Sequence, residues 1–429
     1  MTHIFFSGIG GAGIGPLAII AKQAGYQVSG SDRAHGLSID YLKSIGIDQI
    51  IIGQNEENIS AVHAKNPIDW FVYSSAILFN PTEHPELKFA KTNRIKHSKR
   101  DEFLSDLIKE KKLKLLAIAG THGKTSTTAI AIWLAKELKL SISYLVGSKI
   151  PFGEPGAYDQ KSEWFIYECD EFDYNFLAFR PDIALIPGVS WDHQEIFPTQ
   201  ESYNQAFEKF FNQCLQINCW QEEARRFKLD HNPKNKILNA KDPEINKIKL
   251  AGAPMRMNAW LAISAIEKIT AAPKELLIEI AARYPGAGRR MEKLKENLFS
   301  DYAHTIEKIA GCINIALELK KENQKLIVVY EPHSNIRQHY VKEQYYNLFN
   351  GADKIYWLPT FLAREVKNID TYSPAQLITY LKTPEIAETT ELSQGLKEKL
   401  ESHLKSDDLV ICIGAGGAKS LDEWIRGNL

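Results

Sequence analysis

The chain has 429 residues, with 52 Lys or Arg and 53 Asp or Glu, so its formal net charge is −1. Its 44% hydrophobic and 24% charged residues are typical of a globular protein and exclude a disordered or fibrous one. The balanced charge argues against bulk binding of nucleic acid or of an anionic membrane, because such binding needs clustered Lys and Arg without matching acids.

The first third of the chain predicts a parallel sheet. Residues 4–8 (IFFSG) form an apolar strand that runs into glycines, residues 17–24 have helical spacing, and a second strand at 27–30 ends at Ser31 and Asp32. This order of strand, glycine turn, helix and strand is typical of a doubly wound, Rossmann-like sheet. Further apolar runs continue it at residues 50–52 and 70–73.

A charged run, KEKKLK at residues 109–114, interrupts this pattern, and we interpret it as a solvated helix end near a domain boundary. The second third then opens with an apolar strand at 115–120, followed by a loop and an Ala-rich helix at 124–139. Further strands are expected at residues 164–168 and 183–186. Because ligands lie at the carboxyl ends of strands in α/β sheets, we expect the chemistry there. The Lys- and Asn-rich segment 228–249 predicts a surface excursion.

The last third begins after PGAGRR at residues 285–290 and again alternates strands with helical patterns. Its strands are expected at residues 326–330, 354–358 and 409–413, the last running into GAGG at 414–417. Such alternation implies a parallel sheet with right-handed crossovers. The fold class is therefore α/β, and the length agrees with about three domains. We predict their boundaries at residues 1–112, 113–284 and 285–429.

The five cysteines argue against a disulfide-stabilised protein. Their number is odd, and only Cys214 and Cys219 lie close together, so neither a complete disulfide framework nor a CxxC metal site is expected. The N-terminal sequence has no basic region before its apolar run, and no apolar stretch approaches the 18 residues that a membrane span needs. We expect a cytoplasmic protein without a signal peptide or a membrane partner.

The strongest chemical motif is GTHGKTSTT at residues 120–128, between an apolar strand and a helix. A phosphate cradle needs glycines so that N–H groups point inward, a Lys for the β/γ-phosphates and a hydroxyl for the metal. Lys124 and Thr125 fit the last two roles. Ile118 occupies the first glycine position of the eight-residue pattern, so the match is partial, and a capped helix start is the alternative. The context favours binding of a nucleoside triphosphate.

Acidic residues follow the next predicted strand, in ECDEFD at residues 168–173. Carboxylates at this place suit Mg²⁺, which prefers hard oxygen ligands and phosphate oxygens. Four acids in six residues are too many for a buried strand unless a cation compensates them, although a solvated loop is the alternative. The motif WDH at residues 191–193 follows another strand, and a single histidine such as His193 is more often structural than a ligand.

The glycines of GIGGAG at residues 8–13 have the spacing of a dinucleotide-binding turn, with Asp32 nineteen residues after the last glycine. Alone, this motif is weak evidence for NAD. A hydride-transfer enzyme has no use for the phosphate loop that follows, so the pyrophosphate here equally fits a nucleotide sugar. An NAD-dependent oxidoreductase therefore rests on these glycines alone.

Three further motifs mark the last third. Arginines in GRR at residues 288–290 can stabilise charge on transferred phosphoryl oxygens, although an exposed basic turn is the alternative. DYAH follows at residues 301–304. In EPHSNIR at residues 331–337, His333 and Arg337 could face a carboxylate, or serve only as polar loop residues.

The order of these motifs is that of one family. The sequence has GIGGAGIG, then SSAI followed by Asn80-Pro81, then GTHGKT, ECDEFD, a D-H pair, GRR, DYAH and a terminal GAG. In this order, and along almost its whole length, the chain resembles the Mur ligases of peptidoglycan synthesis. The resemblance implies an N-terminal Rossmann-like domain for a UDP-sugar, a central P-loop ATPase with a mainly parallel sheet, and a C-terminal Rossmann-like domain for an amino acid.

The resemblance also implies roles for individual residues at the matching positions. Those implied for catalysis are Lys124, His193, Arg290, His304, His333 and Arg337. Those implied for ATP are Gly120, Thr121, His122, Gly123, Lys124, Thr125, Ser126, Asn258 and Asp301. Those implied for Mg²⁺ are Thr125, Glu168 and His193. Those implied for the UDP-sugar are Gly10, Gly11, Ala12, Gly13, Asp32, Ser74, Ser75 and Arg100.

The reaction that the resemblance implies is ATP-driven amide formation. A muramate carboxylate attacks the γ-phosphate, and an amine then displaces phosphate from the acyl phosphate. A carboxylate is a poor electrophile because its leaving oxygen is basic and its charge repels the amine, and phosphorylation removes both obstacles. Mg²⁺ and Lys124 would screen the repulsion between the anionic muramate carboxylate and the anionic nucleotide. Domain closure would keep water from the acyl phosphate.

Some positions depart from the family pattern. Pro187-Gly188 stands where the family usually has Thr-Asn, and Pro254-Met255 stands where it usually has His-Asn, ahead of Asn258-Ala259. The segment between Phe211 and Gly252 is also shorter than usual. A degenerate ligase that binds the UDP-sugar without turnover is therefore an alternative hypothesis.

The amine acceptor has two candidates. The GIGGAG and GTHGKT loops are most similar to family members that join L-alanine to UDP-N-acetylmuramate, and this is the leading hypothesis. The stretch 195–211 and the EPHSN segment at 331–335 are closer to members that join a whole tripeptide to the same sugar nucleotide in recycling. In either case we expect a monomer or a homodimer.

Overall fold

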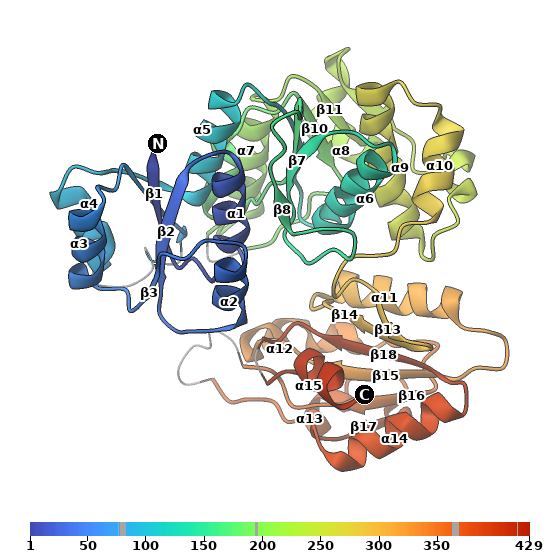
Figure 1. The fold of residues 1–429 in the computed structure, drawn as a ribbon. Helices are drawn as coiled ribbons and strands as arrows, with labels where there is room; N and C mark the ends of the chain where they lie inside the picture. The colour runs from blue at the N-terminus through green and yellow to red at the C-terminus, as the bar shows by residue number, and fades with distance from the viewer. Residues whose placement is uncertain (76, 78–82, 194–195, 363–368, 418) are drawn as a thin grey trace. The chain divides into compact units, whose positions relative to one another are not determined.

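The computed structural model describes residues 1–75, 77, 83–193, 196–362, 369–417 and 419–429, and Figure 1 shows its helices and strands. The chain divides into two compact units. The first contains Met1–Ile248 and Met257–Tyr284, and the second contains Lys249–Arg256 and Pro285–Leu429. The first unit holds a five-stranded and a seven-stranded sheet, and the second a six-stranded sheet. The predicted α/β class with mostly parallel sheets is confirmed.

The N-terminal sheet is entirely parallel and has the order β3-β2-β1-β4-β5. Its strands are β1 (His3–Ser7), β2 (Gln27–Asp32), β3 (Ile50–Ile52), β4 (Trp70–Tyr73) and β5 (Lys96–Lys99). Its helices are α1 (Gly15–Gln23), α2 (Leu37–Ser44), α3 (Glu56–Lys65), α4 (Pro85–Thr92) and α5 (Arg100–Glu110). The end of α5 at Glu110 agrees with the solvated helix end predicted from the charged run.

Helices cover both faces of this sheet, which explains why its strands are almost continuously apolar. Phe6 of β1 packs into a core with α1, α2 and α5, whereas the next side chain back, Phe5, packs with Phe71 against α3 and α4. Figure 1 shows α1 and α2 on one side of β1 and β2, and α3 and α4 on the other. The doubly wound arrangement leaves the carboxyl ends of β1 and β2 for the glycine loop.

The central sheet has the order β12-β11-β10-β6-β9-β7-β8, and within the described residues its strands pair in parallel except for the antiparallel β7–β8 pair. Its strands are β6 (Lys114–Ile118), β7 (Ile142–Leu145), β8 (Gly156–Ala157), β9 (Trp164–Glu168), β10 (Ile183–Ile186), β11 (Ile217–Trp220) and β12 (Lys236–Leu238). Its α-helices are α6 (Lys124–Glu137), α7 (Gln200–Phe211), α8 (Gln221–Phe227), α9 (Ala253–Thr270) and α10 (Lys274–Ala282). Its 3-10 helices are η2 (Phe172–Ala178), η3 (Leu229–His231) and η4 (Pro243–Lys247).

Strand β6 lies in the middle of the central sheet, between β10 and β9. The three predicted motifs of this region therefore leave adjacent strands at one edge. The segment 228–249 was expected to be a surface excursion, and this expectation is wrong in part. It contains β12, which pairs in parallel with β11. Because β12 is an edge strand with a partner on one side only, its surroundings are rich in Lys and Asn, and no apolar run in the sequence indicates it.

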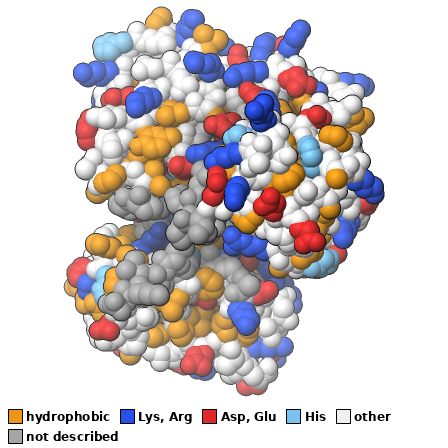
Figure 2. Space-filling model, turned by 90° about the vertical axis from the view of Figure 1, so that its left-hand side faces the viewer, with side chains coloured by type: hydrophobic (Ala, Val, Ile, Leu, Met, Phe, Trp, Pro, Cys, Tyr) orange, Lys and Arg blue, Asp and Glu red, His pale blue; other side chains and the backbone are white. Residues whose placement is uncertain are grey.

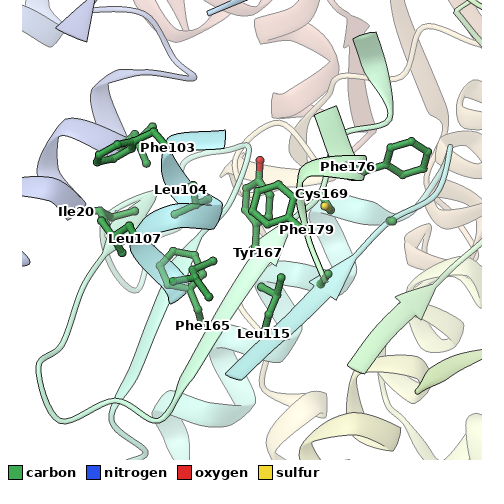
Figure 3. Close-up of a cluster of buried hydrophobic side chains, with 14 of the residues drawn as sticks. Ile20, Phe103, Leu104, Leu107, Leu115, Phe165, Tyr167, Cys169, Phe176 and Phe179 are labelled. Atoms are coloured by element: carbon green, nitrogen blue, oxygen red, sulfur yellow. The ribbon is translucent and has the colours of Figure 1, made fainter. Parts of the chain in front are cut away.

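A hydrophobic core joins the N-terminal and central sheets within the first unit. Figure 3 shows Ile20 of α1 and Phe103, Leu104 and Leu107 of α5 beside Phe165 of the central strand β9. All five side chains are 1% exposed or less, so this part of the first unit is closely packed. Close packing of this kind has few alternatives, and it fixes the glycine loop relative to the P-loop.

The C-terminal sheet has the order β13-β14-β18-β15-β16-β17, with an antiparallel β13–β14 pair at one edge. Its strands are β13 (Glu292–Lys295), β14 (Leu298–Asp301), β15 (Leu326–Glu331), β16 (Lys354–Trp357), β17 (Ala387–Thr389) and β18 (Leu409–Gly414). Its α-helices are α11 (Ile306–Leu319), α12 (Asn335–Val341), α13 (Pro374–Ile378), α14 (Gln394–Lys405) and α15 (Leu421–Asn428). Its 3-10 helices are η5 (Lys342–Tyr345) and η6 (Pro384–Ile386).

The surface mixes charges of both signs. On the face drawn in Figure 2, Lys and Arg side chains are interspersed with Asp and Glu, in agreement with the near-zero net charge. Within the described residues, no helix combines the length and the apolar character that crossing a membrane requires.

Candidate active site

The GTHGKT motif forms a tight turn between β6 and α6. Gly120 and Gly123 have φ values of +149° and +74°, a region that L side chains rarely adopt. Pro187 and Gly188, which follow β10, pack against this turn. A Cβ at Gly120 would lie 2.7 Å from the carbonyl oxygen of Gly188, and the Thr121 N–H donates to that oxygen at 2.8 Å. The Pro-Gly pair that departs from the family pattern therefore supports the loop backbone directly.

Lys124 is the first residue of α6, and its ammonium is held by two acceptors. Its Nζ donates to the carbonyl oxygen of Gly120 at 2.6 Å and to Oε2 of Glu171 at 2.6 Å. Burial lowers the pKa of Lys124, but the charges of Glu171 and Asp170 outweigh burial and the net direction is upward. The ammonium therefore stays protonated, and its third N–H is the donor left for a phosphate oxygen.

Glu171 is the buried centre of this site, with its side chain 1% exposed. Besides Lys124, it accepts a hydrogen bond from the Tyr203 hydroxyl at 3.3 Å, and its Oε1 lies 3.8 Å from Nε2 of His193. The Tyr203 hydroxyl lies 2.7 Å from Oγ1 of Thr121, so the P-loop itself holds this arrangement. The sequence indicated Glu171 only as one acid of a cluster, and nothing in it indicated Tyr203.

Thr125 and Glu168 lie together, as expected for a magnesium site. The Thr125 hydroxyl donates to Oε1 of Glu168 at 2.8 Å, and the Gly147 N–H donates to Oε2 at 2.8 Å. A hydroxyl and a carboxylate are hard oxygen donors, which Mg²⁺ combines with phosphate oxygens. These residues therefore fit a magnesium ion. Among the residues that the structure describes, no three His, Cys, Asp or Glu side chains form a metal site by themselves, so a bound triphosphate would complete it.

The acidic cluster ECDEFD divides between two partners. Glu168 and Glu171 face the P-loop, as described above. Asp170 instead lies 3.4 Å from Nη2 of Arg100, and Asp173 pairs with Nζ of Lys99 at 2.5 Å. Asp173 has a φ of 52°, a left-handed conformation that turns the backbone after the strand. Half of the cluster therefore faces the N-terminal part of the first unit.

The remaining residues predicted for ATP in the first unit also lie near the P-loop. His122 Nε2 lies 2.7 Å from Oγ of Ser190, in the segment that precedes His193. Ser126 is buried in the first turn of α6. Asn258 of α9 is close enough that a Cβ at Gly123 would lie 2.6 Å from its Oδ1. The structure therefore gathers the predicted residues 120–126 with Asn258.

The glycine loop at residues 8–13 is held by backbone contacts and by Asp32. The N–H groups of Gly8 and Ile9 donate to the carbonyl oxygen of Ser31 at 2.8 and 2.9 Å. The Gly10 N–H donates to Oδ2 of Asp32 at 2.8 Å, and Oδ1 of Asp32 accepts from the N–H of Arg33 at 2.7 Å. Asp32 therefore fixes the loop at this position, in addition to any contact with a ribose.

A cavity of about 290 Å³ connects the glycine loop to the P-loop site within the first unit. Arg100 lies directly against the glycine loop, since a Cβ at Gly13 would lie 2.3 Å from Nη1 of Arg100. The cavity is lined by Ala12, Gly13, Leu17, Arg100, Asp101, Leu104, Lys124, Leu145, Val146, Gly147, Tyr167, Glu168 and Asp170. Residues predicted for a sugar nucleotide, for ATP and for a metal thus border one space.

Ser74 and Ser75 directly follow β4, at the same edge of the N-terminal sheet, and Ser75 is buried. Asn80 and Pro81, which belong to the same motif, lie outside the described residues. Sequence reasoning missed Glu86 at the start of α4. Its fully buried carboxylate accepts a hydrogen bond from the Ser7 hydroxyl at 2.6 Å, at the end of β1. Ser7 and Glu86 are 79 residues apart in the chain, so no local pattern in the sequence indicates this contact.

In the second unit, the GRR and DYAH motifs meet at β14. Asp301 is buried and accepts hydrogen bonds from the N–H groups of Met291 and Ala303, both at 2.8 Å. Burial raises the pKa of Asp301, and the nearby Arg290 opposes this shift. Arg289, not Arg290, holds the terminal GAG turn, because its Nη2 donates to the carbonyl oxygen of Gly414 at 2.8 Å.

His304, His333 and Arg337 also come together in the second unit. Nη1 of Arg337 donates to the carbonyl oxygen of His304 at 3.3 Å, and the rings of His304 and His333 have centroids 5.9 Å apart. Burial, assisted by Lys308, lowers the pKa of His304 to about 3, so its imidazole is neutral near pH 7. Its Nδ1 lies 2.9 Å from the carbonyl oxygen of Tyr302, which fixes the ring.

Comparisons with known proteins identify the family of the chain. The model of the Mur ligase family, catalytic domain, matches residues 3–112, and that of the Mur ligase middle domain matches residues 118–253. A UDP-N-acetylmuramate–L-alanine ligase of Clostridium acetobutylicum is 28% identical, over 98% of this chain and 96% of that protein. One of Rickettsia felis is also 28% identical, over 100% of this chain and 97% of that protein.

Solved structures agree in fold. The UDP-N-acetylmuramate-alanine ligase of Thermotoga maritima has a TM-score of 0.72 at 23% identity, covering 97% of this chain and 96% of that one. A murein peptide ligase of Psychrobacter arcticus has a TM-score of 0.65 at 20% identity, covering 100% of each chain. The two family models together match more than half of the chain. The chain therefore belongs to the Mur ligase family and is an ATP-dependent ligase.

Proposed function

We propose that the protein joins L-alanine to UDP-N-acetylmuramate in an ATP-dependent reaction that passes through an acyl phosphate. Full-length relatives from two bacteria bear the name of this reaction. The observation that carries the proposal is the cavity where Gly13 and Arg100 face Lys124 and Glu168. A carboxylate on the sugar nucleotide would meet a γ-phosphate in this space. An enzyme for either ligand alone would not need both sets of residues around one cavity.

We further propose that the ligands divide among three domains at residues 1–112, 113–284 and 285–429. The three sheets support this division, because each has its own carboxyl edge at which a ligand would bind. The first would bind the UDP-sugar, the second ATP and the third the amine acceptor.

In the proposed mechanism, Lys124 binds the γ-phosphate as the muramate carboxylate attacks it. Its ammonium reduces the repulsion between the two anions, and Glu171 keeps it oriented and protonated. Ala12 and Gly13 of the glycine loop, which line the cavity, would with Arg100 hold the pyrophosphate and sugar so that the carboxylate has a fixed approach. In the C-terminal domain, Arg337 would pair with the carboxylate of the amino acid, next to the neutral His304.

We propose Mg²⁺ as the metal and Thr125, Glu168 and His193 as the residues that hold it. Thr125 and Glu168 already share a hydrogen bond, and His193 lies beside Glu171. When bound, the metal would supply positive charge to the phosphate oxygens. Arg290 would supply further charge to the phosphate, and Asp301 would contact the nucleotide.

A second candidate acceptor is the tripeptide used in recycling. The EPHSN segment at residues 331–335 supports it, as does the likeness in fold to a murein peptide ligase along the full chain. Both reactions use the same sugar nucleotide, so residues of the N-terminal domain favour neither. We also propose that the protein acts in the cytoplasm, which the five free cysteines support. A monomer or a homodimer is proposed as its oligomeric state.

Phosphate release tests the proposed function. Purified protein is given ATP, MgCl₂ and UDP-N-acetylmuramate, with L-alanine or with L-alanyl-γ-D-glutamyl-meso-diaminopimelate. We expect release that depends on L-alanine. Release with the tripeptide alone would assign the recycling reaction. If neither acceptor supports release while calorimetry shows binding of the UDP-sugar, the chain is a degenerate ligase, in which Pro187-Gly188 and Pro254-Met255 replace residues needed for turnover.

A further inference from the structure

Arg100 is held in place from two sides. Its Nε donates to Oδ2 of Asp101 at 2.9 Å, its Nη2 lies 3.4 Å from Oδ2 of Asp170, and its Nη1 lies against Gly13. Its side chain is 26% exposed, so part of the guanidinium faces the cavity. A planar guanidinium that is tied through Nε and one terminal nitrogen has its orientation fixed.

Asp101 is buried more deeply than the arginine it contacts. Its side chain is 2% exposed, and both of its oxygens are used: Oδ2 accepts from Arg100 and Oδ1 accepts from the Tyr167 hydroxyl. The buried carboxylate is therefore fully paired.

The pairing crosses from one sheet to the other within the first unit. Arg100 and Asp101 begin α5, which belongs to the N-terminal sheet, whereas Tyr167 is in β9 of the central sheet. The residue after Tyr167 is Glu168, which contacts Thr125 at the P-loop. Tyr167 is also packed in the shared hydrophobic core, beside Phe179 in Figure 3, so its hydroxyl has little freedom to move. An anchor this rigid can orient a charged side chain accurately.

Burial of this carboxylate has no advantage for folding alone. Taking a carboxylate out of water is costly, and well-packed apolar side chains would commonly serve stability as well or better. The Asp101 carboxylate instead reaches Arg100, which lines the cavity beside the glycine loop. The arrangement is therefore suited to holding that arginine in one orientation.

We propose that Asp101 and Tyr167 are positioning residues that hold the Arg100 guanidinium toward an anionic group of the sugar nucleotide, at the cavity beside Gly13. This inference rests on the proposed function, and it names the contact by which the central sheet influences binding of the sugar nucleotide. The anionic group is a phosphate or carboxylate oxygen, which a guanidinium binds through parallel N–H donors.

The variants Asp101→Asn and Tyr167→Phe test this proposal. Tyr167→Phe removes a single oxygen from the core, so it retains the fold even if Asp101→Asn does not. We expect calorimetry to show at least tenfold weaker binding of UDP-N-acetylmuramate in each variant, or about 1.4 kcal/mol. The KM for ATP should stay within twofold of the wild type, because the hydrogen bonds that hold Lys124 and Glu171 are made with Gly120, Tyr203 and each other.

Asp173→Asn is the matched control. It removes one carboxylate from an ion pair between the same two stretches of chain, but its partner is Lys99, which does not contact Arg100 in the pairs described here. We expect its affinity for the UDP-sugar to be that of the wild type. Equal losses in Asp173→Asn and Asp101→Asn would overturn the proposal, because they would indicate a general loosening of this contact.

A double-mutant cycle with Arg100→Ala separates positioning from packing. If Asp101 and Tyr167 act through the guanidinium, Tyr167→Phe should weaken binding no further once Arg100 is absent. A full tenfold loss in the Arg100→Ala background would overturn the proposal. If the wild-type protein bound no UDP-N-acetylmuramate at all, the proposed function would fail as well. Normal wild-type binding with unaffected variants would reject the positioning role alone.

Discussion

The two glycine-rich loops of the first unit present anion-binding groups in different ways. Each follows a central strand of a parallel sheet and leads into a helix, and each is held by an acid from a neighbouring segment. In the loop at residues 8–13, Asp32 accepts the N–H of Gly10. In the loop at residues 120–125, Glu171 accepts a hydrogen bond from the ammonium of Lys124. The first acid fixes backbone, whereas the second fixes a charged side chain.

Their supports differ as well. The first loop begins at Ser7, whose hydroxyl is bonded to the buried Glu86, so polar groups lie beneath it. The second begins after Ile118 and Ala119, which are fully buried and apolar, and Pro187 packs against its glycines. The loop at residues 8–13 therefore depends on Arg100, from another element, for positive charge, whereas the loop at residues 120–125 carries its own lysine. Each loop can therefore be disabled without the other.

The largest effect is expected from Lys124→Ala. Loss of the ammonium removes the charge that binds the γ-phosphate, so we expect kcat to fall by about 10²- to 10³-fold. The affinity for UDP-N-acetylmuramate should change by less than tenfold, about 1.4 kcal/mol, because in the proposed division of ligands the sugar nucleotide uses the other loop. Phosphate-release kinetics and calorimetry measure the two effects.

The double variant Lys124→Ala, Glu171→Gln is the control for stability. Lys124→Ala alone leaves the buried Glu171 without its ammonium partner, which should lower the thermal midpoint. Neutralising Glu171 should restore the midpoint but not the turnover. Recovery of turnover together with stability would show that the lysine matters only for folding and would reject its role in phosphate binding.

Two glycine substitutions should separate the loops. At Gly13 the backbone tolerates alanine, but the new Cβ would lie 2.3 Å from Nη1 of Arg100 and displace it. We expect Gly13→Ala to weaken UDP-sugar binding roughly tenfold, or about 1.4 kcal/mol, with the KM for ATP unchanged. Gly123→Ala should instead raise the KM for ATP and leave the affinity for the UDP-sugar unchanged. The reason is that Gly123 has a φ of +74° and that a Cβ there would lie 2.6 Å from Oδ1 of Asn258.

Calorimetry measures the affinity of each variant for the UDP-sugar, and kinetics with varied ATP measure the KM for ATP of each variant. Far-UV circular dichroism of both variants controls for folding. If both substitutions impaired the same ligand, the two loops would not serve separate ligands, and the proposed division of the cavity would be wrong.

Sequence reasoning predicted the centre of each sheet well. Central strands such as Ile183–Ile186 are buried on both faces and read as continuous apolar runs, and glycines mark the loops that follow. The edge strand Ile50–Ile52 is apolar and was predicted, but other edge strands gave no such signal. Lys96–Lys99 and Glu292–Lys295 are mostly polar or charged, because an edge strand has a partner on one side and solvent on the other.

The P-loop and the acidic cluster ECDEFD were predicted because each is a short local motif at the end of an apolar strand. The division of ECDEFD was not, since Asp170 and Asp173 find partners 70 and 74 residues earlier in the chain. The same limit hid Asp101 and Tyr167, whose contact spans 66 residues. Roles that depend on contacts between distant segments need the fold, and the ligand roles of the predicted residues remain predictions that the experiments above address.

The smallest expected effect concerns the polar support of the first loop. Burial raises the pKa of Glu86 to about 7 from its ordinary value of 4.5, and the nearby Asp32 adds to the shift, while the Ser31 and Ser7 hydroxyls oppose it. The folded chain therefore holds a proton between these values that the unfolded chain releases. The associated stability is fully present below about pH 4.5 and is lost as the pH rises through about 7.

Glu86→Gln tests this dependence, because glutamine is neutral at every pH. We expect the thermal midpoint of the variant to rise relative to that of the wild type as the pH increases from 5 to 8. The corresponding gain in the free energy of unfolding should be at most about 3 kcal/mol, because each pKa unit of the shift is worth about 1.4 kcal/mol. Glu57→Gln, on the exposed face of α3, should show no such trend. A difference between Glu86→Gln and the wild type that stays constant with pH would mean that Glu86 is charged throughout. The support of the first loop would then be ionic, like that of the second, and this contrast between the loops would disappear.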